Sequence, residues 1–136
     1  MTLKTLDGKD VKLSGQKGNV VLLDLWATWC PPCRKSLPHV QELSADKALA
    51  QKGLVVWAVN SQEPAATAEK FLKENKYTFT VPMDAEGKVG KAYLVTGIPT
   101  TVIVGRDGTI KDVFIGFGPN SGKAIDAAVA KALAEK

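Results

Sequence analysis

At 136 residues, with 45% hydrophobic and 24% charged residues, the chain has the size and composition of a globular protein that can bury its own core. Its net charge of +4 comes from basic residues that are dispersed along the chain, which argues against a nucleic-acid-binding face. No apolar run is long enough to cross a membrane and no signal peptide follows Met1, so we expect no membrane contact by this chain itself.

The N-terminal half predicts a hairpin, two buried strands and a helix. An Asp-Gly pair lies in the middle of residues 2–14, whose alternating pattern favours a β-hairpin. The apolar runs Asn19–Trp26 and Gly53–Asn60 are typical of central strands buried on both faces. Between them, apolar residues at helical spacing predict one helix from Pro31 to about Ala50.

The C-terminal half predicts shorter elements and a closing helix. They are a helix over Pro64–Asn75, a strand near Tyr77–Val81, a helix near Asp84–Tyr93, an antiparallel hairpin around Gly105–Gly108 and a helix around Ile125–Leu133. Pro64 suits the first turn of its helix. The order of elements predicts an α/β protein, a three-layer sandwich with a mixed central sheet, folded as a single domain over residues 1–136.

The chain has only two cysteines, Cys30 and Cys33, and they lie three positions apart. A disulfide across two residues closes a very small loop, so it would remove little entropy from the unfolded chain. A structural zinc site needs four ligands, and in addition to the two thiols the chain has only one histidine. The spacing therefore favours a redox pair over a structural disulfide or a metal site.

The residues around the cysteines suit thiolate chemistry. Cys30 follows a predicted strand and precedes Pro31, a good first helical residue, so Cys30 is expected at the N-cap, where the helix dipole favours a negative sulfur. Pro31 and Pro32 have no N–H, which leaves the amides of Cys33 and Arg34 to face that sulfur. Cys33, one turn into the helix, should be shielded from solvent.

The segment WATWCPPCRKSLP, residues 26–38, resembles the active site of the thioredoxin superfamily, and more narrowly of its TlpA/ResA-like branch. The resemblance covers nearly the whole chain and implies a thioredoxin fold with an N-terminal β-hairpin and a central insertion. It also implies a thiol–disulfide oxidoreductase that reduces protein disulfides, with Cys30 as the attacking and Cys33 as the resolving cysteine. Tryparedoxin-like electron carriers to peroxidases share a WCPPC motif and are an alternative, as is a copper-handling module on the same fold.

The same resemblance implies particular partners and a location. A redox partner must re-reduce the cysteine pair, and no dissociable cofactor is needed. We expect a monomer that works outside the cytoplasm, with membrane-linked electron donors and a role such as cytochrome maturation. The chain would then be the mature part of a longer precursor.

Two acidic residues are candidates for proton transfer. Asp24 interrupts an apolar strand, so burial should raise its pKa and make it a proton acceptor for Cys33. It matches the buried aspartate of thioredoxins, but Ala58 stands where thioredoxins place a lysine. The alternative is an aspartate paired with a lysine at the rim of the sheet. Glu63 matches an active-site glutamate of ResA-like proteins, or alternatively complements the dipole of the helix that follows it.

The remaining candidates would bind the substrate. Pro99 matches the cis-proline of the superfamily, and a cis Ile98–Pro99 bond would expose the Ile98 backbone beside the sulfurs, where an extended substrate could pair with it. Trp29 resembles the exposed tryptophan of the family's substrate surface, which Pro31 and Pro32 extend. Trp26 and Trp57, in contrast, lie in predicted strands and are assigned to the core.

Overall fold

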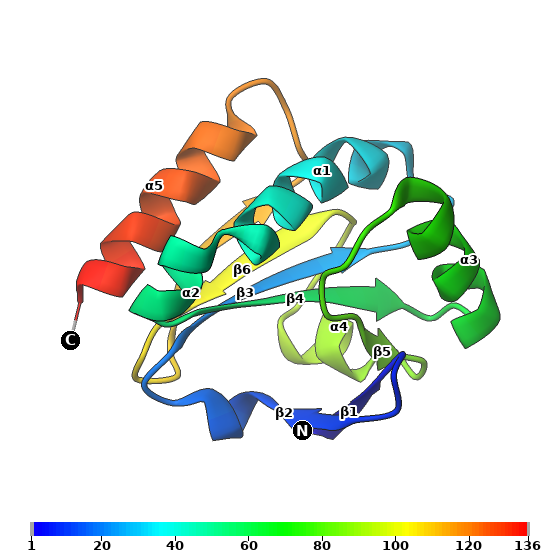
Figure 1. The fold of residues 1–136 in the computed structure, drawn as a ribbon, viewed down its shortest axis with the longest axis horizontal. Coiled ribbons are helices and arrows are strands. Elements are labelled where there is room, and N and C mark those ends of the chain that lie inside the picture. The colour runs from blue at the N-terminus through cyan, green and yellow to red at the C-terminus, as the bar shows by residue number, and fades with distance from the viewer. Residues whose placement is uncertain (1, 136) are drawn as a thin grey trace.

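The computed structural model describes residues 2–135 and consists of one seven-stranded sheet flanked by helices (Figure 1). The strands are β1 (Thr2–Thr5), β2 (Asp10–Lys12), β3 (Val20–Trp26), β4 (Leu54–Ser61), β5 (Pro82–Asp84), β6 (Thr100–Val104) and β7 (Ile110–Ile115). The helices are the 3₁₀ helix η1 (Leu13–Gln16) and α1 (Pro31–Ala45), α2 (Lys47–Lys52), α3 (Ala65–Asn75), α4 (Lys88–Ala92) and α5 (Ser121–Ala134). No helix among the described residues is both long and apolar enough to cross a membrane.

The sheet has the order β2-β1-β5-β4-β3-β6-β7 and is mixed, as predicted. Strand β3 lies at its centre, parallel to β4 and antiparallel to β6. The N-terminal hairpin joins the sheet through β1, which pairs with β5. The segment between β4 and the β6–β7 hairpin, where the central insertion was expected, contains α3, β5 and α4.

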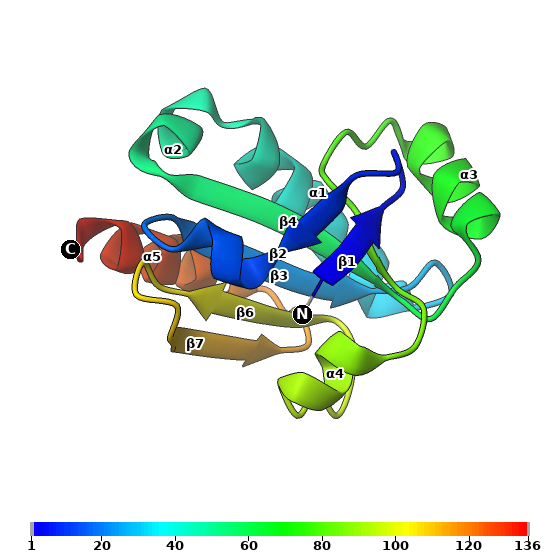
Figure 2. The ribbon, with the colours of Figure 1, turned by 90° about the horizontal axis from the view of Figure 1, so that it is seen from below.

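Two apolar clusters cover the two faces of the sheet, and α1 and α4 lie on opposite sides of it (Figures 1 and 2). Leu22 and Trp26 of β3 pack with α1 and α5, whereas Leu23 and Leu25 pack on the face that α4 covers. Because both faces are covered, all seven residues of β3 are buried, which explains its nearly continuous apolar run.

The single helix predicted from Pro31 to about Ala50 is two helices, which corrects the prediction. Helix α1 ends at Ala45, and Asp46 adopts an extended backbone (φ −77°, ψ 103°). The Asp46 carboxylate accepts the Leu49 N–H at 3.1 Å and so caps α2. A side chain that competes for backbone amides in this way favours a helix start over a helix interior.

The strand predicted near Tyr77–Val81 is also wrong in its position. In that range only Thr80 pairs with the sheet, through an isolated bridge to Trp57, and the paired strand β5 begins at Pro82. The Tyr77 N–H donates to the Leu72 carbonyl at 3.0 Å, so this residue completes the end of α3. Because Tyr77 still belongs to the end of α3, the paired strand begins only several residues later, at Pro82.

Two helix starts are shifted by a few residues. Helix α4 begins at Lys88, because Asp84 lies in β5 and its buried carboxylate accepts the N–H groups of Val89 and Gly90 at 3.1 and 3.3 Å. Pro64 is the N-cap of α3 and lies just before its first turn.

Candidate active site

The two cysteines lie at the N-terminus of α1, directly after the central strand. They form a disulfide, with Cα atoms 5.2 Å apart. Cys30 is the N-cap as predicted, and the Cys33 N–H points at its Sγ at 3.2 Å. The Arg34 amide, which we expected beside the sulfur, instead donates to the Cys30 carbonyl oxygen at 3.2 Å. One amide and the positive end of the helix therefore face the Cys30 sulfur.

The surroundings of the pair leave little sulfur exposed. Cys33 is fully buried as predicted, and only 2% of Cys30 is exposed. The neighbouring Trp29 is 68% exposed, and Pro31 and Pro32 are exposed as well. A partner would therefore meet a protruding apolar rim first and reach the disulfide only at the edge of Cys30.

The loop before β6 lies against Cys30. The Ile98–Pro99 peptide bond is cis, as predicted. The Ile98 carbonyl oxygen lies 3.6 Å from Cys30 Sγ, although the two residues are 68 positions apart in the chain. The backbone of Ile98 is thus beside the sulfur, as the family resemblance implied.

Asp24 is fully buried in the middle of β3. It alternates with Leu22 and Trp26, which belong to the apolar cluster that contains Cys33, so its side chain lies on the face that α1 covers. Its Oδ1 accepts a hydrogen bond from the Thr101 hydroxyl at 3.1 Å. Its Oδ2 has no hydrogen-bond partner within residues 2–135.

Burial raises the pKa of Asp24 from 3.8 to about 7, and the hydrogen bond from Thr101 opposes this rise. The predicted upward shift is confirmed, and its cause is the loss of hydration of the charged form. The alternative of a lysine-paired aspartate at the rim is wrong, because Asp24 is central and is flanked in register by Ala58 and Thr101.

Glu63 is bound to the loop that carries the cysteines. Its Oε1 accepts the Thr28 N–H at 2.8 Å, and its Oε2 accepts the Thr28 hydroxyl at 2.6 Å. Asn60 Nδ2 also donates to Oε1, at 2.9 Å. Glu63 directly precedes Pro64, the N-cap of α3, and no side chain makes a capping hydrogen bond there; its expected complement to the dipole of α3 stays a prediction.

The other side of the same loop is held by Arg34. Its Nε and Nη2 atoms both donate to the Thr28 carbonyl oxygen, at 3.1 and 3.0 Å, and its guanidinium lies 5.4 Å from the centre of the Phe71 ring. Every polar group of Thr28 is thus engaged by a charged side chain. We call Glu63, Thr28 and Arg34 the Thr28 clamp; it fixes the backbone two residues before Cys30.

The model of the Redoxin family matches residues 1–132. The chain belongs to the Redoxin family. Sporulation thiol-disulfide oxidoreductase A of Bacillus subtilis is 36% identical over 115 residues, which cover 84% of this redoxin and 69% of that protein. The thiol-disulfide oxidoreductase ResA of Geobacillus thermodenitrificans is 33% identical over 114 residues, covering 84% and 64%. This redoxin therefore spans about two thirds of the length of these relatives.

Solved structures show the same fold. A Chlorobium tepidum protein assigned as the thiol:disulfide interchange protein DsbE superposes with a TM-score of 0.89 at 37% identity, covering 98% of this redoxin and 92% of that chain. The exposed lipoprotein thioredoxin Etrx1 of Streptococcus pneumoniae superposes with a TM-score of 0.83 at 29% identity, covering 96% of this redoxin and 98% of that chain. This redoxin has the thioredoxin fold, and its CxxC pair and relatives place it among the thiol–disulfide oxidoreductases.

Sequence reasoning missed several residues that support the site. Asn60 is fully buried, and its Oδ1 has no hydrogen-bond partner among the described residues. A polar residue at the end of an apolar strand could have indicated it, as it did for Asp24. Thr28, Arg34 and Thr101 gave no comparable signal, because hydroxyls and arginines near a helix start are common on protein surfaces.

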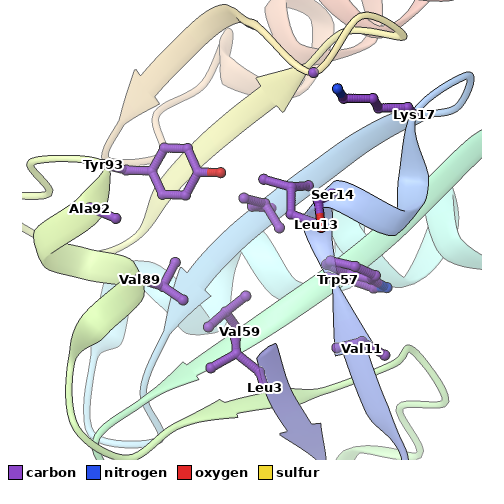
Figure 3. A pocket seen from close by; sticks show the side chains of 12 residues that line it. Leu3, Val11, Leu13, Ser14, Lys17, Trp57, Val59, Val89, Ala92 and Tyr93 are labelled. Atoms are coloured by element: carbon purple, nitrogen blue, oxygen red, sulfur yellow. The ribbon is translucent and has the colours of Figure 1, made fainter. Parts of the chain in front are cut away.

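A second feature lies away from the cysteines. An apolar pocket of about 470 Å³ lies on the face that α4 covers, between the N-terminal hairpin, η1 and α4 (Figure 3). Trp57 and Val59 of β4 lie on its sheet side, and Tyr93 points toward it from beyond α4. It shares no residue with the surroundings of the disulfide described above.

Proposed function

We propose that this redoxin reduces disulfide bonds of protein substrates by thiol–disulfide exchange through Cys30 and Cys33. The observation that carries the proposal is the placement of the pair: Cys30 caps α1 beside the Ile98 backbone, and Cys33 is buried directly behind it. This arrangement presents one sulfur to a partner and keeps the second for an internal attack.

The first step is attack by Cys30 in the reduced protein. Its thiolate forms a bond to one sulfur of the substrate disulfide, and the other substrate sulfur leaves as a thiolate. The Cys33 N–H and the positive end of α1 stabilise the charge on Cys30 before the attack. Trp29, Pro31, Pro32 and the Ile98–Pro99 backbone form the surface on which the substrate lies.

The second step is resolution by Cys33. Asp24 accepts the Cys33 proton, and the Cys33 thiolate then attacks Cys30 and releases the second substrate thiolate. The substrate gains two electrons and the Cys30–Cys33 disulfide forms. A pKa of about 7 allows Asp24 to be ionised near neutral pH, and its unpartnered Oδ2 leaves a lone pair for the proton.

Glu63 acts in this scheme as a positioning residue. Both of its oxygens already accept hydrogen bonds from Thr28 or Asn60, so its carboxylate holds the Thr28 clamp. Asp24 has the free oxygen that a proton acceptor needs. We therefore assign proton transfer to Asp24 and loop position to Glu63.

The reaction needs a second protein that re-reduces the pair, and no dissociable cofactor takes part. We propose that the reaction takes place outside the cytoplasm and that the protein works as a monomer. The location is supported by the similarity to Etrx1, which is described as an exposed lipoprotein.

Disulfide reduction of insulin by the reduced wild type, Cys30→Ser and Cys33→Ser tests the roles of the cysteines. We expect Cys30→Ser to be inactive, and Cys33→Ser to accumulate a mixed disulfide visible by mass spectrometry, because it can attack but cannot resolve. Activity of Cys30→Ser, or the absence of a trapped complex with Cys33→Ser, would contradict the proposal.

A further inference from the structure

A groove of about 590 Å³ begins at Ile98, the residue whose carbonyl touches Cys30 Sγ, and extends along α4. We call it the α4 groove; Gln62, Lys91, Leu94 and Ile98 are the lining residues used here. It differs from the apolar pocket of Figure 3, which lies between α4 and the N-terminal hairpin. Because Ile98 lines the groove and its carbonyl oxygen lies 3.6 Å from Cys30 Sγ, a molecule bound at this end of the groove would lie near the reacting sulfur.

Leu94 is unusual in both exposure and backbone. The N–H groups of Leu94 and Val95 donate to the Lys91 and Gly90 carbonyls, at 3.2 and 2.8 Å, which is the Schellman ending of a helix. Leu94 occupies the left-handed position of that motif (φ 54°), where glycine is the usual residue. Its side chain is 84% exposed. A strained backbone and an exposed apolar side chain both oppose folding and solubility, so neither is explained by stability.

A second residue that lines the groove has the same kind of strain. Among the described residues, three that are not glycine have a left-handed backbone, and two of them, Gln62 and Leu94, line this groove. Residues held in such conformations cluster at ligand-binding sites. Helix α4, which lines the groove, is held at its start by the buried Asp84 carboxylate, which accepts the Val89 and Gly90 N–H groups.

The charge of the groove has one sign. Lys91 lines it, and no ion pair to Lys91 exists within residues 2–135. No aspartate or glutamate lines the groove. An occupant with a carboxylate near an apolar side chain would complement both Lys91 and Leu94.

We propose that the α4 groove binds the segment of the substrate protein next to its reactive cysteine, with an apolar side chain on Leu94 and a carboxylate on Lys91. This inference rests on the proposed function and adds a substrate class to it: disulfides flanked by apolar and acidic residues. The reaction itself is unchanged, since the groove only raises the concentration of such disulfides at Cys30.

The substrate preference of the α4 groove can be tested with short cysteine peptides that are joined by a disulfide to thionitrobenzoate. Attack by Cys30 on the peptide sulfur releases thionitrobenzoate thiolate, which absorbs light, and all peptides share the same reactive bond. The series places leucine and aspartate, leucine and lysine, or serine and asparagine beside the cysteine. We expect the reduced wild type to react with the leucine–aspartate peptide about tenfold faster than with the serine–asparagine peptide, the scale of one apolar contact in a pocket.

Leu94→Gly should abolish this preference, and Lys91→Glu should reverse the preference between the aspartate and lysine peptides. Lys76→Gly is the matched control, because Lys76 occupies the same left-handed Schellman position at the end of α3 (φ 57°), and it should keep the preference. Neither glycine variant should lower the melting temperature, since each relieves a strained backbone.

A wild type that reacts with all peptides at the same rate, or a Leu94→Gly variant that keeps the tenfold preference, would overturn the role of the groove and leave the proposed function standing. Absence of thionitrobenzoate release from every peptide would instead contradict the proposed function itself.

Discussion

Replacing Asp24 by asparagine should stabilise the oxidised protein at neutral and alkaline pH. In the unfolded chain this carboxyl ionises near its ordinary pKa of 3.8, whereas in the folded chain its pKa is about 7 because burial removes its hydration. The folded state therefore holds a proton that the unfolded state has lost, and stability falls as the pH rises through this interval.

The size of the effect follows from the two pKa values. Each pH unit between 3.8 and about 7 corresponds to about 1.4 kcal/mol, so ionised Asp24 lowers the free energy of unfolding by about 4 kcal/mol. The loss is absent below the unfolded pKa, grows with pH and is complete above the folded pKa. Asparagine has no charge to bury and escapes this loss.

This loss of unfolding free energy can be measured by urea unfolding of the wild type and Asp24→Asn. The measurements run from about pH 4 to about pH 8.5 with the disulfide intact. The difference between the two proteins should grow by about 4 kcal/mol across this range. Asp10→Asn is the control, since it makes the same substitution at a carboxyl whose side chain is 66% exposed. Parallel curves for the wild type and Asp24→Asn would refute the burial argument.

Three further predictions concern the residues around this carboxyl and the helix boundaries. Thr101→Val removes the hydrogen bond that lowers the pKa of Asp24, so this pKa should rise further. In stopped-flow measurements, the pH profile of mixed-disulfide resolution should then move to higher pH. An unmoved profile would contradict this prediction. Glu63→Gln loses the acceptor for the Thr28 hydroxyl and should lower the free energy of unfolding in urea by about 1–2 kcal/mol without moving that pH profile. If Glu63→Gln moves the profile and Asp24→Asn does not, Glu63 is the proton acceptor. Asp46→Ala removes the cap of α2 and should cost about 1 kcal/mol in the same unfolding assay, whereas no loss would show that the break between α1 and α2 does not depend on the cap.

Local sequence was sufficient for the centre of the site. The spacing of Cys30 and Cys33, the proline after Cys30 and the apolar strand before it predicted the N-cap position and the buried second sulfur, because all of them depend on neighbouring residues in one strand–helix unit. The raised pKa of Asp24 was predictable for the same reason: a carboxyl in a strand buried on both faces loses its water wherever the strand lies.

Tertiary structure alone decided the hydrogen-bond partners. Glu63 binds Thr28 across 35 residues of sequence, and Ile98 reaches Cys30 across 68; in the second case family resemblance, rather than the residues, supplied the expectation. Such pairs depend on how strands β3, β4 and β6 are aligned in the sheet, and a shift of one residue would turn each side chain to the other face. Burial and backbone preference are encoded locally in the chain, whereas the partner of a given polar atom is set by elements that meet only after folding.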